Sequence, residues 1–387
     1  MEDRWNAFVP YPHAEVEGAD AGPLRGLRLA VKDLFDVAGY PTAAGNAVLL
    51  SASGVKTQTA PLVTTLLNAG ARFVGKTNTD ELAYSLTGDN IHFGMPVNPS
   101  NPEKISGGSS SGSAVAVAAQ LADVGLGTDT SGSIRLPAAV NGLIGWRPTH
   151  GSLNTDGLRP LAPSFDVPGF ITARMEPLKA IMDALGLKGR EAQASSILIA
   201  EDMLDSIDPV IAKSIVRSVE STGLRVEMVR AFATIIPDDL TTAFVTILQR
   251  EAWECNRAFF EQHGETVAPG IATRLLAGSR LDAVDVREAY GLRNAFRNET
   301  AHLLAFGNVV ALPTLPMEAP LRDAGADQLM AFRGRCIRLL CLAGLGGYPQ
   351  LAFPASAGGR EFSLSLLGAP NADRMLVDTA GRVRQLQ

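Results

Sequence analysis

The sequence predicts an α/β fold. Short strand-like segments alternate with helical segments from residue 27 to residue 366, which is the pattern of a β-sheet covered by helices. Of the 387 residues, 46% are hydrophobic and 19% are charged, so the chain can bury a large core. We find no internal repeat and no linker-like stretch. We therefore expect one α/β domain over residues 1–387, with a helical elaboration at about 175–305.

The first elements follow this alternation. Residues 27–31 (LRLAV) form a short apolar run that is typical of a strand. Residues 60–69 have helical periodicity and precede Gly70, a residue that commonly follows the end of a helix. Residues 71–75 return to a strand pattern. The chain is therefore expected to begin with a strand, a helix and a second strand.

A Gly/Ser-rich stretch at residues 106–113 is expected to open the next helix. It leads directly into residues 114–121 (AVAVAAQL), most of which are good helix formers. A flexible linker would not do this, so we interpret the stretch as an ordered loop before a helix.

Seven further segments complete the predicted order. Strands are expected at 196–199, 224–228, 309–313, 350–354 and 362–366, and long amphipathic helices at 237–262 and 282–305. The last strand alternates apolar and polar residues, as a strand with one buried face does.

Composition and charge exclude several classes of function. The net charge is −6 and no Lys/Arg cluster is interleaved with aromatic residues, so we expect no nucleic-acid partner. The first residues, Met1–Trp5, lack the pattern of a signal peptide, and no apolar run approaches the roughly 18 residues of a membrane span. We therefore expect a cytoplasmic protein without a membrane partner. Cys255, Cys336 and Cys341 have no metal-ligand spacing, which predicts buried free thiols, no metal and no cofactor.

Two segments match known motifs by spelling but not by context. Gly70–Thr77 fits the phosphate-binding P-loop, which connects a strand to a helix, whereas Gly70 follows a helix and Arg72–Val74 is strand-like. Ser53–Lys56 fits the S-x-x-K pattern of penicillin-recognising enzymes but has no S-D-N or K-T-G partner. We interpret neither segment as a functional site.

Gly108–Gly112 fits the G-x-S-x-G nucleophile elbow, which would make Ser110 the nucleophile of an α/β-hydrolase. That mechanism also needs a histidine on a loop, but His263 lies at the end of one predicted helical segment and His302 lies within the other. We keep it as an alternative to a larger arrangement.

The larger arrangement joins three separated segments. Lys32 follows the first strand, Ser109 lies in the first Gly/Ser-rich loop, and Ser133 lies in a second such loop at residues 127–138. The separation of 24 residues between Ser109 and Ser133 accommodates one helix and one strand, which would return the chain to the same edge of the sheet. We therefore expect the two serines to meet.

These segments resemble the signature of the amidase signature family, serine hydrolases whose triad is a lysine, a bridging serine and a nucleophilic serine. The resemblance runs from about residue 25 to 175, resumes from about 307 to 368, and includes Asn78–Glu81, Asn98–Pro99 and Gly142–Gly151. It implies a mixed, twisted β-sheet core sandwiched between α-helices. Within the family, the segment KDLFDVAG and the GGSSSGS spelling are most similar to indole-3-acetamide hydrolases.

The resemblance implies a role for individual residues. The implied catalytic residues are Lys32 as base, Ser109 as bridge and Ser133 as nucleophile. The implied oxyanion hole is formed by backbone N–H groups of the turn that contains Thr130, Ser131 and Gly132. The implied supporting residues are Ser110, Asp129 and Arg135. We assign His92 and His150 to structure, and expect Tyr84, Trp146 and Phe165 to include at least one wall of the substrate pocket.

Lysine can act as the base only when it is neutral. Burial without a partner carboxylate can lower a lysine pKa from near 10.4 by about 3–5, and Lys32 ends an apolar strand. Asp33 need not neutralise it, because consecutive strand residues point to opposite faces. One departure from the family is Ser131, where its usual Thr-Asp-Thr-Gly-Gly-Ser has glycine. If that position needs a left-handed backbone, serine costs about 1–2 kcal/mol.

The resemblance implies an amidohydrolase that cleaves a small carboxylic amide through an acyl-enzyme, with a homodimer as one candidate assembly. Two alternatives stay open. One is the amidase-like subunit of a glutamine-dependent tRNA amidotransferase, which needs a protein partner. The other is a noncatalytic binding module with an amidase fold, as in some chloroplast import receptors, and the intact Lys32, Ser109 and Ser133 argue against it.

Overall fold

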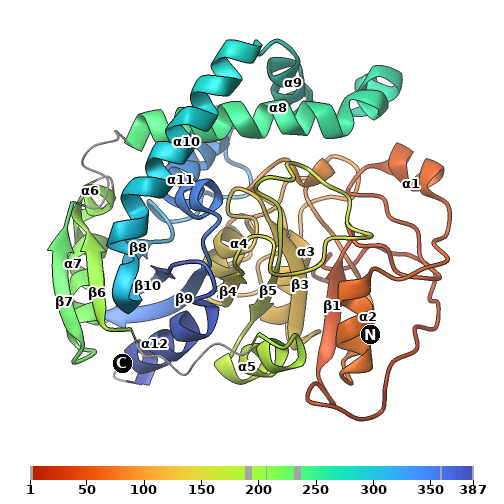
Figure 1. The fold of residues 1–387 in the computed structure, drawn as a ribbon. Coiled ribbons are helices and arrows are strands. Elements are labelled where there is room, and N and C mark those ends of the chain that lie inside the picture. The colour runs from red at the N-terminus through yellow and green to blue at the C-terminus, as the bar shows by residue number, and fades with distance from the viewer. Residues whose placement is uncertain (1–2, 188–193, 206, 231–236, 358–359, 386–387) are drawn as a thin grey trace.

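The computed structural model describes residues 3–187, 194–205, 207–230, 237–357 and 360–385. Within these ranges, strands form a ten-stranded sheet in the order β2-β1-β3-β5-β4-β9-β10-β8-β6-β7 (Figure 1). The strands are β1 Arg28–Lys32, β2 Arg72–Thr77, β3 Val124–Asp129, β4 Ile144–Arg147, β5 Val167–Thr172, β6 Ser196–Ala200, β7 Arg225–Val229, β8 Asn308–Pro313, β9 Gln350–Ala357 and β10 Arg360–Leu367. The sheet is mixed, as the resemblance to the amidase signature family implied.

Strand direction explains where the candidate site lies. β1 is parallel to both β2 and β3, and β6 is parallel to both β7 and β8. Between these groups, the pairs that link β3, β5, β4, β9, β10 and β8 are antiparallel. Because β1 and β3 are parallel, their carboxyl ends meet at one edge of the sheet, and in open α/β sheets such an edge commonly carries the ligand site.

Helices flank the sheet. They are α1 Ala47–Ser53, α2 Pro61–Asn68, α3 Ser111–Ala118, α4 Arg135–Val140, α5 Met175–Ala184, α6 Glu201–Leu204, α7 Pro209–Glu220, α8 Pro237–His263, α9 Pro269–Ser279, α10 Ala283–Leu303, α11 Ala326–Gly346 and α12 Asp373–Gln385. α3 packs on β1, β2, β3 and β5, whereas α5 packs on β5 and contacts α12. α8 contacts α9, α10 and α11; α8 and α9 lie at the top of Figure 1, and α10 runs downward from them.

The local sequence explains where several helices begin. Asp208 and Asp282 precede α7 and α10, and each carboxylate accepts hydrogen bonds from two backbone N–H groups of the first turn. α2 and α9 begin with Pro61 and Pro269, whose missing N–H is not needed at that position.

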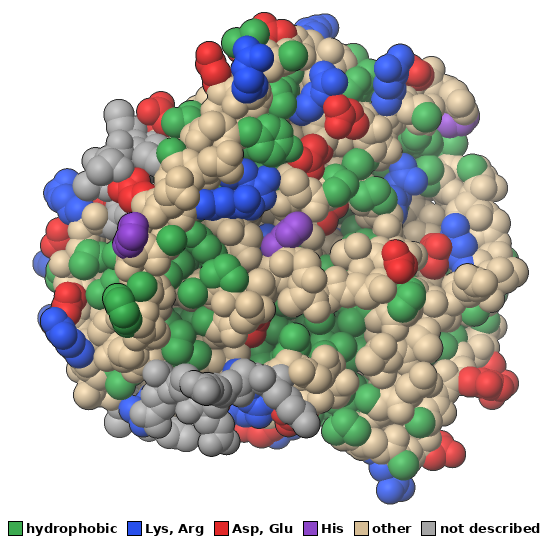
Figure 2. Space-filling model, in the orientation of Figure 1, with side chains coloured by type: hydrophobic (Ala, Val, Ile, Leu, Met, Phe, Trp, Pro, Cys, Tyr) green, Lys and Arg blue, Asp and Glu red, His purple; other side chains and the backbone are tan. Residues whose placement is uncertain are grey.

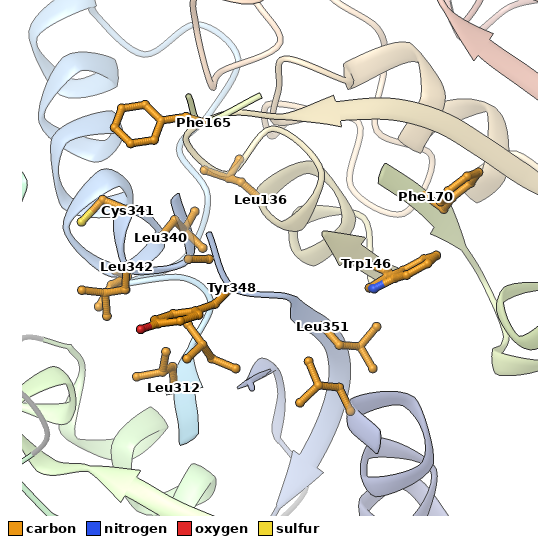
Figure 3. Close-up of a cluster of buried hydrophobic side chains, with 14 of the residues drawn as sticks. Leu136, Trp146, Phe165, Phe170, Leu312, Leu340, Cys341, Leu342, Tyr348 and Leu351 are labelled. Atoms are coloured by element: carbon orange, nitrogen blue, oxygen red, sulfur yellow. The ribbon is translucent and has the colours of Figure 1, made fainter. Parts of the chain in front are cut away.

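The core between the sheet and α11 is built from close aromatic and aliphatic contacts (Figure 3). Trp146 of β4 stacks on Phe170 of β5, with ring centroids 5.6 Å apart. The ring of Phe165 packs against that of Phe244 in α8, with ring centroids 4.5 Å apart. Leu340 lies on α11, most of whose second half is buried. This packing fixes the loops that end β3 and begin β5.

The strands and helices expected from the sequence are present within a few residues of their predicted bounds. The segment at 175–305 contains β6 and β7 as well as helices, and both strands join the sheet. Helices α1, α4, α11 and α12 were not among the predicted elements. Cys336 and Cys341 are buried free thiols, as expected, whereas Cys255 is only partly buried.

Candidate active site

The predicted catalytic residues converge at the edge where β1 and β3 end. Lys32 is the last residue of β1, Ser109 lies just before α3, and Ser133 follows β3. One helix and one strand, α3 and β3, connect the two serines. The backbone N–H of Ser110 donates to the carbonyl of Ser133 at 3.2 Å, which joins the two loops directly. The Gly108–Ser109 peptide bond is cis.

Lys32 is fully buried among hydroxyl groups. Its Nζ lies 2.8 Å from Ser109 Oγ, 3.0 Å from Ser110 Oγ and 2.8 Å from Thr128 Oγ1. The Ser110 hydroxyl donates to the Thr128 carbonyl at 3.2 Å. When Lys32 is neutral, therefore, its lone pair is left to accept from Ser109 or from the Thr128 hydroxyl.

Burial sets the protonation of this lysine. It lowers the pKa of Lys32 to about 7, although the carboxylates of Asp80, Asp129 and Asp166 act in the opposite direction. Burial also raises the pKa of Asp80 to about 7. Lys32 and Asp80 therefore titrate as a pair near neutral pH. In this range a fraction of Lys32 is a neutral amine, the form that can accept a proton.

Asp33 is paired with a different lysine. Its carboxylate lies 2.9 Å from Lys76 Nζ, and both side chains are fully buried. The hydroxyl of Tyr11 and the N–H of Ala43 also donate to Asp33, at 2.7 and 3.0 Å. These contacts direct the Asp33 charge away from Lys32. They also show that Lys76, in the P-loop-like segment, belongs to strand β2 and forms an ion pair inside the protein.

A buried carboxylate shapes the turn that carries Ser133. Asp129 accepts from Arg135 Nε at 2.9 Å and Nη2 at 2.7 Å, and from the N–H groups of Gly132 and Ile134 at 3.0 and 3.2 Å. Burial acts to raise the pKa of Asp129, but Arg135 and Arg147 outweigh burial and hold this pKa well below its usual range. Asp129 is therefore charged, and it fixes the turn without facing Ser133 as a reactant.

The backbone N–H groups of this turn are not equivalent. The Gly132 N–H already donates to Asp129, whereas the N–H groups of Thr130 and Ser131 make no hydrogen bond within the part of the chain that the structure describes. Gly132 has φ +121°, and a Cβ there would lie 2.4 Å from Leu340 Cδ1. Ser131 is not among the residues with positive φ. The departure from the family at Ser131 therefore carries no left-handed strain, and Gly132 is the position that needs glycine.

The side chain of Ser133 is buried, and its hydroxyl is not hydrogen-bonded to any described residue. Its side chain is 1% exposed, and its Oγ has no hydrogen-bond partner among the described residues. The structure thus contains the Lys32–Ser109 hydrogen bond but not one between the hydroxyls of Ser109 and Ser133. Catalytic hydrogen bonds are often long without substrate and shorten when it binds.

The expected pocket walls have different surroundings. Trp146 and Phe165 are fully buried in the core, and Trp146 Nε1 donates to Asp373 at 3.0 Å. Tyr84 is also buried, but its hydroxyl has no hydrogen-bond partner among the described residues, and the Arg274 guanidinium lies 5.2 Å from its ring centre.

Both histidines make structural contacts. The ring of His92 lies 3.1 Å from the carboxylate of Glu81, and that of His150 lies 3.0 Å from the carbonyl of Pro163.

Sequence reasoning missed three residues around the site. Thr128 contacts Lys32, Asp80 titrates with it, and Arg147 contacts Asp129. The signal for Thr128 was strand alternation. Because Thr128 directly precedes Asp129 in a strand, its side chain is expected on the opposite face from that of Asp129, and this is the face that contacts Lys32. The other two signals were weaker, because Asp80 and Arg147 lie within longer matching segments in which no pattern distinguishes them.

Two cavities lie near the loops that carry Ser109 and Ser133. One of about 540 Å³ is lined by the 150–166 segment, including Asp166, whose Oδ1 accepts from the Thr130 hydroxyl at 2.6 Å. A second, of about 220 Å³, lies between Glu81–Ile91, α9 and α11. Figure 2 shows charges of both signs scattered over the visible face, without a positively charged stripe.

The described residues contain no cluster of three or more His, Cys, Asp or Glu side chains that could hold a metal ion. In the same part of the chain, no helix is both long enough and apolar enough to cross a membrane.

Comparisons with known proteins identify relatives along nearly the whole chain. A family model described as Amidase matches residues 11–205. Amidase 1 of Arabidopsis thaliana is 35% identical over 92% of this chain and 91% of its own length. A crystal structure of an amidase superposes with a TM-score of 0.83 at 30% identity, covering 94% of this chain and 85% of that one.

A further relative is named for its location rather than for an activity. The chloroplastic outer envelope protein 64 of Arabidopsis thaliana is 30% identical over 92% of this chain and 66% of its own length.

Together, the α/β fold, the matching family model and the near full-length relatives define the class. The chain belongs to the amidase signature family.

Proposed function

We propose that this chain is an amidohydrolase that cleaves a small carboxylic amide, with Ser133 as nucleophile, Ser109 as proton relay and Lys32 as base. The observation that carries the proposal is the environment of Lys32. This buried amine has hydroxyl partners at 2.8–3.0 Å, and its pKa is lowered by burial. Membership of the amidase family and the similarity to a plant amidase support the same class of reaction.

The reaction proceeds in two halves. Ser133 Oγ bonds to the carbonyl carbon while its proton passes to Ser109 and the Ser109 proton passes to Lys32. The N–H groups of Thr130 and Ser131 stabilise the oxyanion. When the C–N bond breaks, Lys32 returns its proton through Ser109 to the leaving nitrogen. Water then attacks the acyl-enzyme through the same relay and releases the carboxylic acid.

Other residues act on this machinery indirectly. Ser110 holds Lys32 and the Thr128 backbone together, at 3.0 and 3.2 Å. Asp129 and Arg135 hold the turn so that the N–H groups of Thr130 and Ser131 point to where the oxyanion forms. The Gly132 N–H, which the sequence analysis included, shapes the turn through Asp129 instead.

The test combines ammonia release with active-site labelling. Wild-type protein should release ammonia from at least one of a panel of aryl-acetamides, aliphatic carboxamides and ureas, and a fluorophosphonate should label it. Ser133→Ala should do neither, and Lys32→Ala should lose almost as much kcat because triad members act as a unit. Ser109→Ala should lose about 10²–10⁴ in rate, because water can take over part of the relay. Ser51→Ala, in α1, is the control.

Two results would overturn the proposal. If the folded wild-type protein neither releases ammonia nor is labelled, the chain is a noncatalytic binding module with an amidase fold and not an enzyme. If Ser110→Ala abolishes labelling and Ser133→Ala does not, Ser110 is the nucleophile.

A further inference from the structure

The smaller cavity beside the candidate site contains two arginines. Its volume is about 220 Å³, and it lies between Glu81–Ile91, the first half of α9 and the first half of α11. Ile271 and Leu329 give it an apolar wall, whereas Arg274 of α9 and Arg333 of α11 give it two positive charges. Each arginine is 9% exposed. Two buried guanidinium groups in one small cavity need an explanation.

Neither arginine has an anionic partner among the described residues. Arg274 Nη2 donates to the Tyr84 carbonyl at 2.6 Å and Nη1 contacts Met330 Sδ at 3.8 Å, but its Nε has no partner. The Nε of Arg333 has none either. Burial lowers the pKa of Arg274 to about 10, and the charge of Arg333 adds to this effect. Both remain charged at neutral pH, so an anion placed between them would remove an unfavourable repulsion.

The nearest carboxylates are not available to them. Glu81 lines the cavity, but its Oε1 accepts from Asn46 Nδ2 at 2.6 Å and its Oε2 from the Ala268 N–H at 2.9 Å. Asp89 also lines the cavity, but it is exposed to solvent. Asp80 is buried beside Lys32, and burial raises its pKa to about 7. Within the described ranges, no carboxylate therefore forms an ion pair with either guanidinium group.

A further donor lies beside the arginines. The hydroxyl of Tyr84 is buried and has no partner within the described ranges, and burial raises the pKa of Tyr84 to about 12, so the phenol is protonated. Its ring lies beneath Arg274. Three buried donors here therefore have no acceptor among the described residues: the Nε groups of Arg274 and Arg333 and the hydroxyl of Tyr84. A carboxylate could accept hydrogen bonds from such donors.

Two elements of the cavity wall also contact the loops that carry Ser133 and Ser109. Arg333 and Leu340 lie on the same helix, and seven residues at 1.5 Å each separate them by about 10 Å along its axis. Leu340 is the residue against which Gly132 packs, next to Ser133. On the other wall, the Gly88 N–H donates to Asp80, whose own N–H donates to the Ser109 carbonyl at 3.2 Å.

We propose that Arg274 and Arg333 bind a carboxylate of the substrate, so that this chain cleaves amides that carry a carboxylate at the far end of a linear spacer, such as monoamides of dicarboxylic acids. The inference rests on the proposed function of Ser133. The planar guanidinium groups match the two oxygens of a carboxylate. The apolar wall accommodates the methylene spacer, and α11 sets the separation between the charged group and the amide that is cleaved.

The first test compares charged and neutral substrates of equal length. Succinamic, glutaramic and adipamic acids are assayed beside butyramide, valeramide and hexanamide. For at least one length, kcat/KM should be about tenfold or more higher for the acid, mainly through KM. Arg333→Gln should reduce this ratio by about tenfold or more, whereas Arg335→Gln, which removes an exposed arginine from the same helix, should leave it unchanged. A neutral amide preferred at every length would overturn the inference.

The second test does not depend on catalysis. Calorimetry with glutarate and adipate is performed on Ser133→Ala protein, and binding is expected that Arg333→Gln in this background abolishes and Arg335→Gln retains. If this binding occurs but no amide is hydrolysed, the carboxylate site stands and the proposed function fails. If hydrolysis occurs but neither dicarboxylate binds, the carboxylate site fails alone. Binding of inorganic phosphate without binding of a dicarboxylate would also overturn it.

Discussion

Thr128→Val tests whether Lys32 is the titrating base. Valine has nearly the shape of threonine, so the change removes one hydroxyl that lies 2.8 Å from Lys32 Nζ and leaves β3 otherwise intact. The hydroxyl accepts a hydrogen bond from the lysine, and an acceptor stabilises a charged donor more than a neutral one. Its loss should therefore destabilise the protonated lysine preferentially and lower the pKa of Lys32 below its value of about 7.

The expected change in the pKa of Lys32 follows from the strength of this hydrogen bond in the charged and in the neutral form of the lysine. A hydrogen bond from a charged group contributes about 1.5–3 kcal/mol and one between neutral groups about 0.5–1.5 kcal/mol. The difference of about 1 kcal/mol corresponds to a pKa lower by about 0.7, at 1.36 kcal/mol for each pH unit. Because the base must be deprotonated, activity rises with pH through this pKa. The variant should keep more of its maximal activity at pH 6 than wild type does.

The assay is the pH dependence of kcat/KM for the best substrate from pH 5 to 9. Thr172→Val is the control, because Thr172 is a fully buried strand threonine with one hydrogen bond, to the Arg174 carbonyl at 2.8 Å. The control should keep the wild-type profile. An acidic limb that stays in place or moves to higher pH in Thr128→Val would refute the reasoning, because Lys32 would not be the group that limits activity.

Three further predictions concern stability, the turn that carries Ser133, and metal. Lys76→Met should lower the free energy of unfolding by about 3–5 kcal/mol, because it leaves Asp33 buried without its partner. Since burial raises the pKa of Asp33, the deficit should shrink as pH falls and the carboxyl is neutralised; urea unfolding at pH 5 and 7, with the exposed pair variant Lys179→Met as control, measures this. Gly132→Ala should abolish fluorophosphonate labelling, whereas Gly142→Ala, at positive φ but with open space around it, should only reduce the melting temperature. EDTA should leave amidase activity unchanged, and activity lost to EDTA and restored by zinc would contradict the proposed mechanism.

The parts of the fold that local pattern determines could be predicted. Strand β1 and helix α2 have clear periodicity and clear ends, and the 24-residue separation of Ser109 and Ser133 sufficed to predict the helix and strand between them. Helix α11 was missed because most of its second half is buried, so it has no polar face to reveal a helical period.

The site was less accessible to sequence reasoning where contacts depend on the tertiary fold. Lys32 and the two serines could be placed through the parallel strands and the resemblance. The pairing of Asp33 with Lys76 joins residues 43 positions apart, one directly after β1 and the other in the neighbouring strand β2, and no local pattern specifies it. The same holds for Arg274 and Arg333, which meet only because α9 and α11 border the same cavity.

The contacts of Arg135 also constrain the order in which the site can mature during synthesis. Besides Asp129, its guanidinium donates to the Leu340 carbonyl at 2.9 Å and to Gln350 Oε1 at 2.6 Å, and the second of these partners lies 215 residues further along the chain. A ribosome that has just made the Ser133 turn has already made Asp129, but it has not yet made Leu340 and Gln350, which hold Arg135 in place. The nascent chain therefore carries all three triad residues long before it can arrange them, and its reactive serine is assembled only when the C-terminal strands emerge.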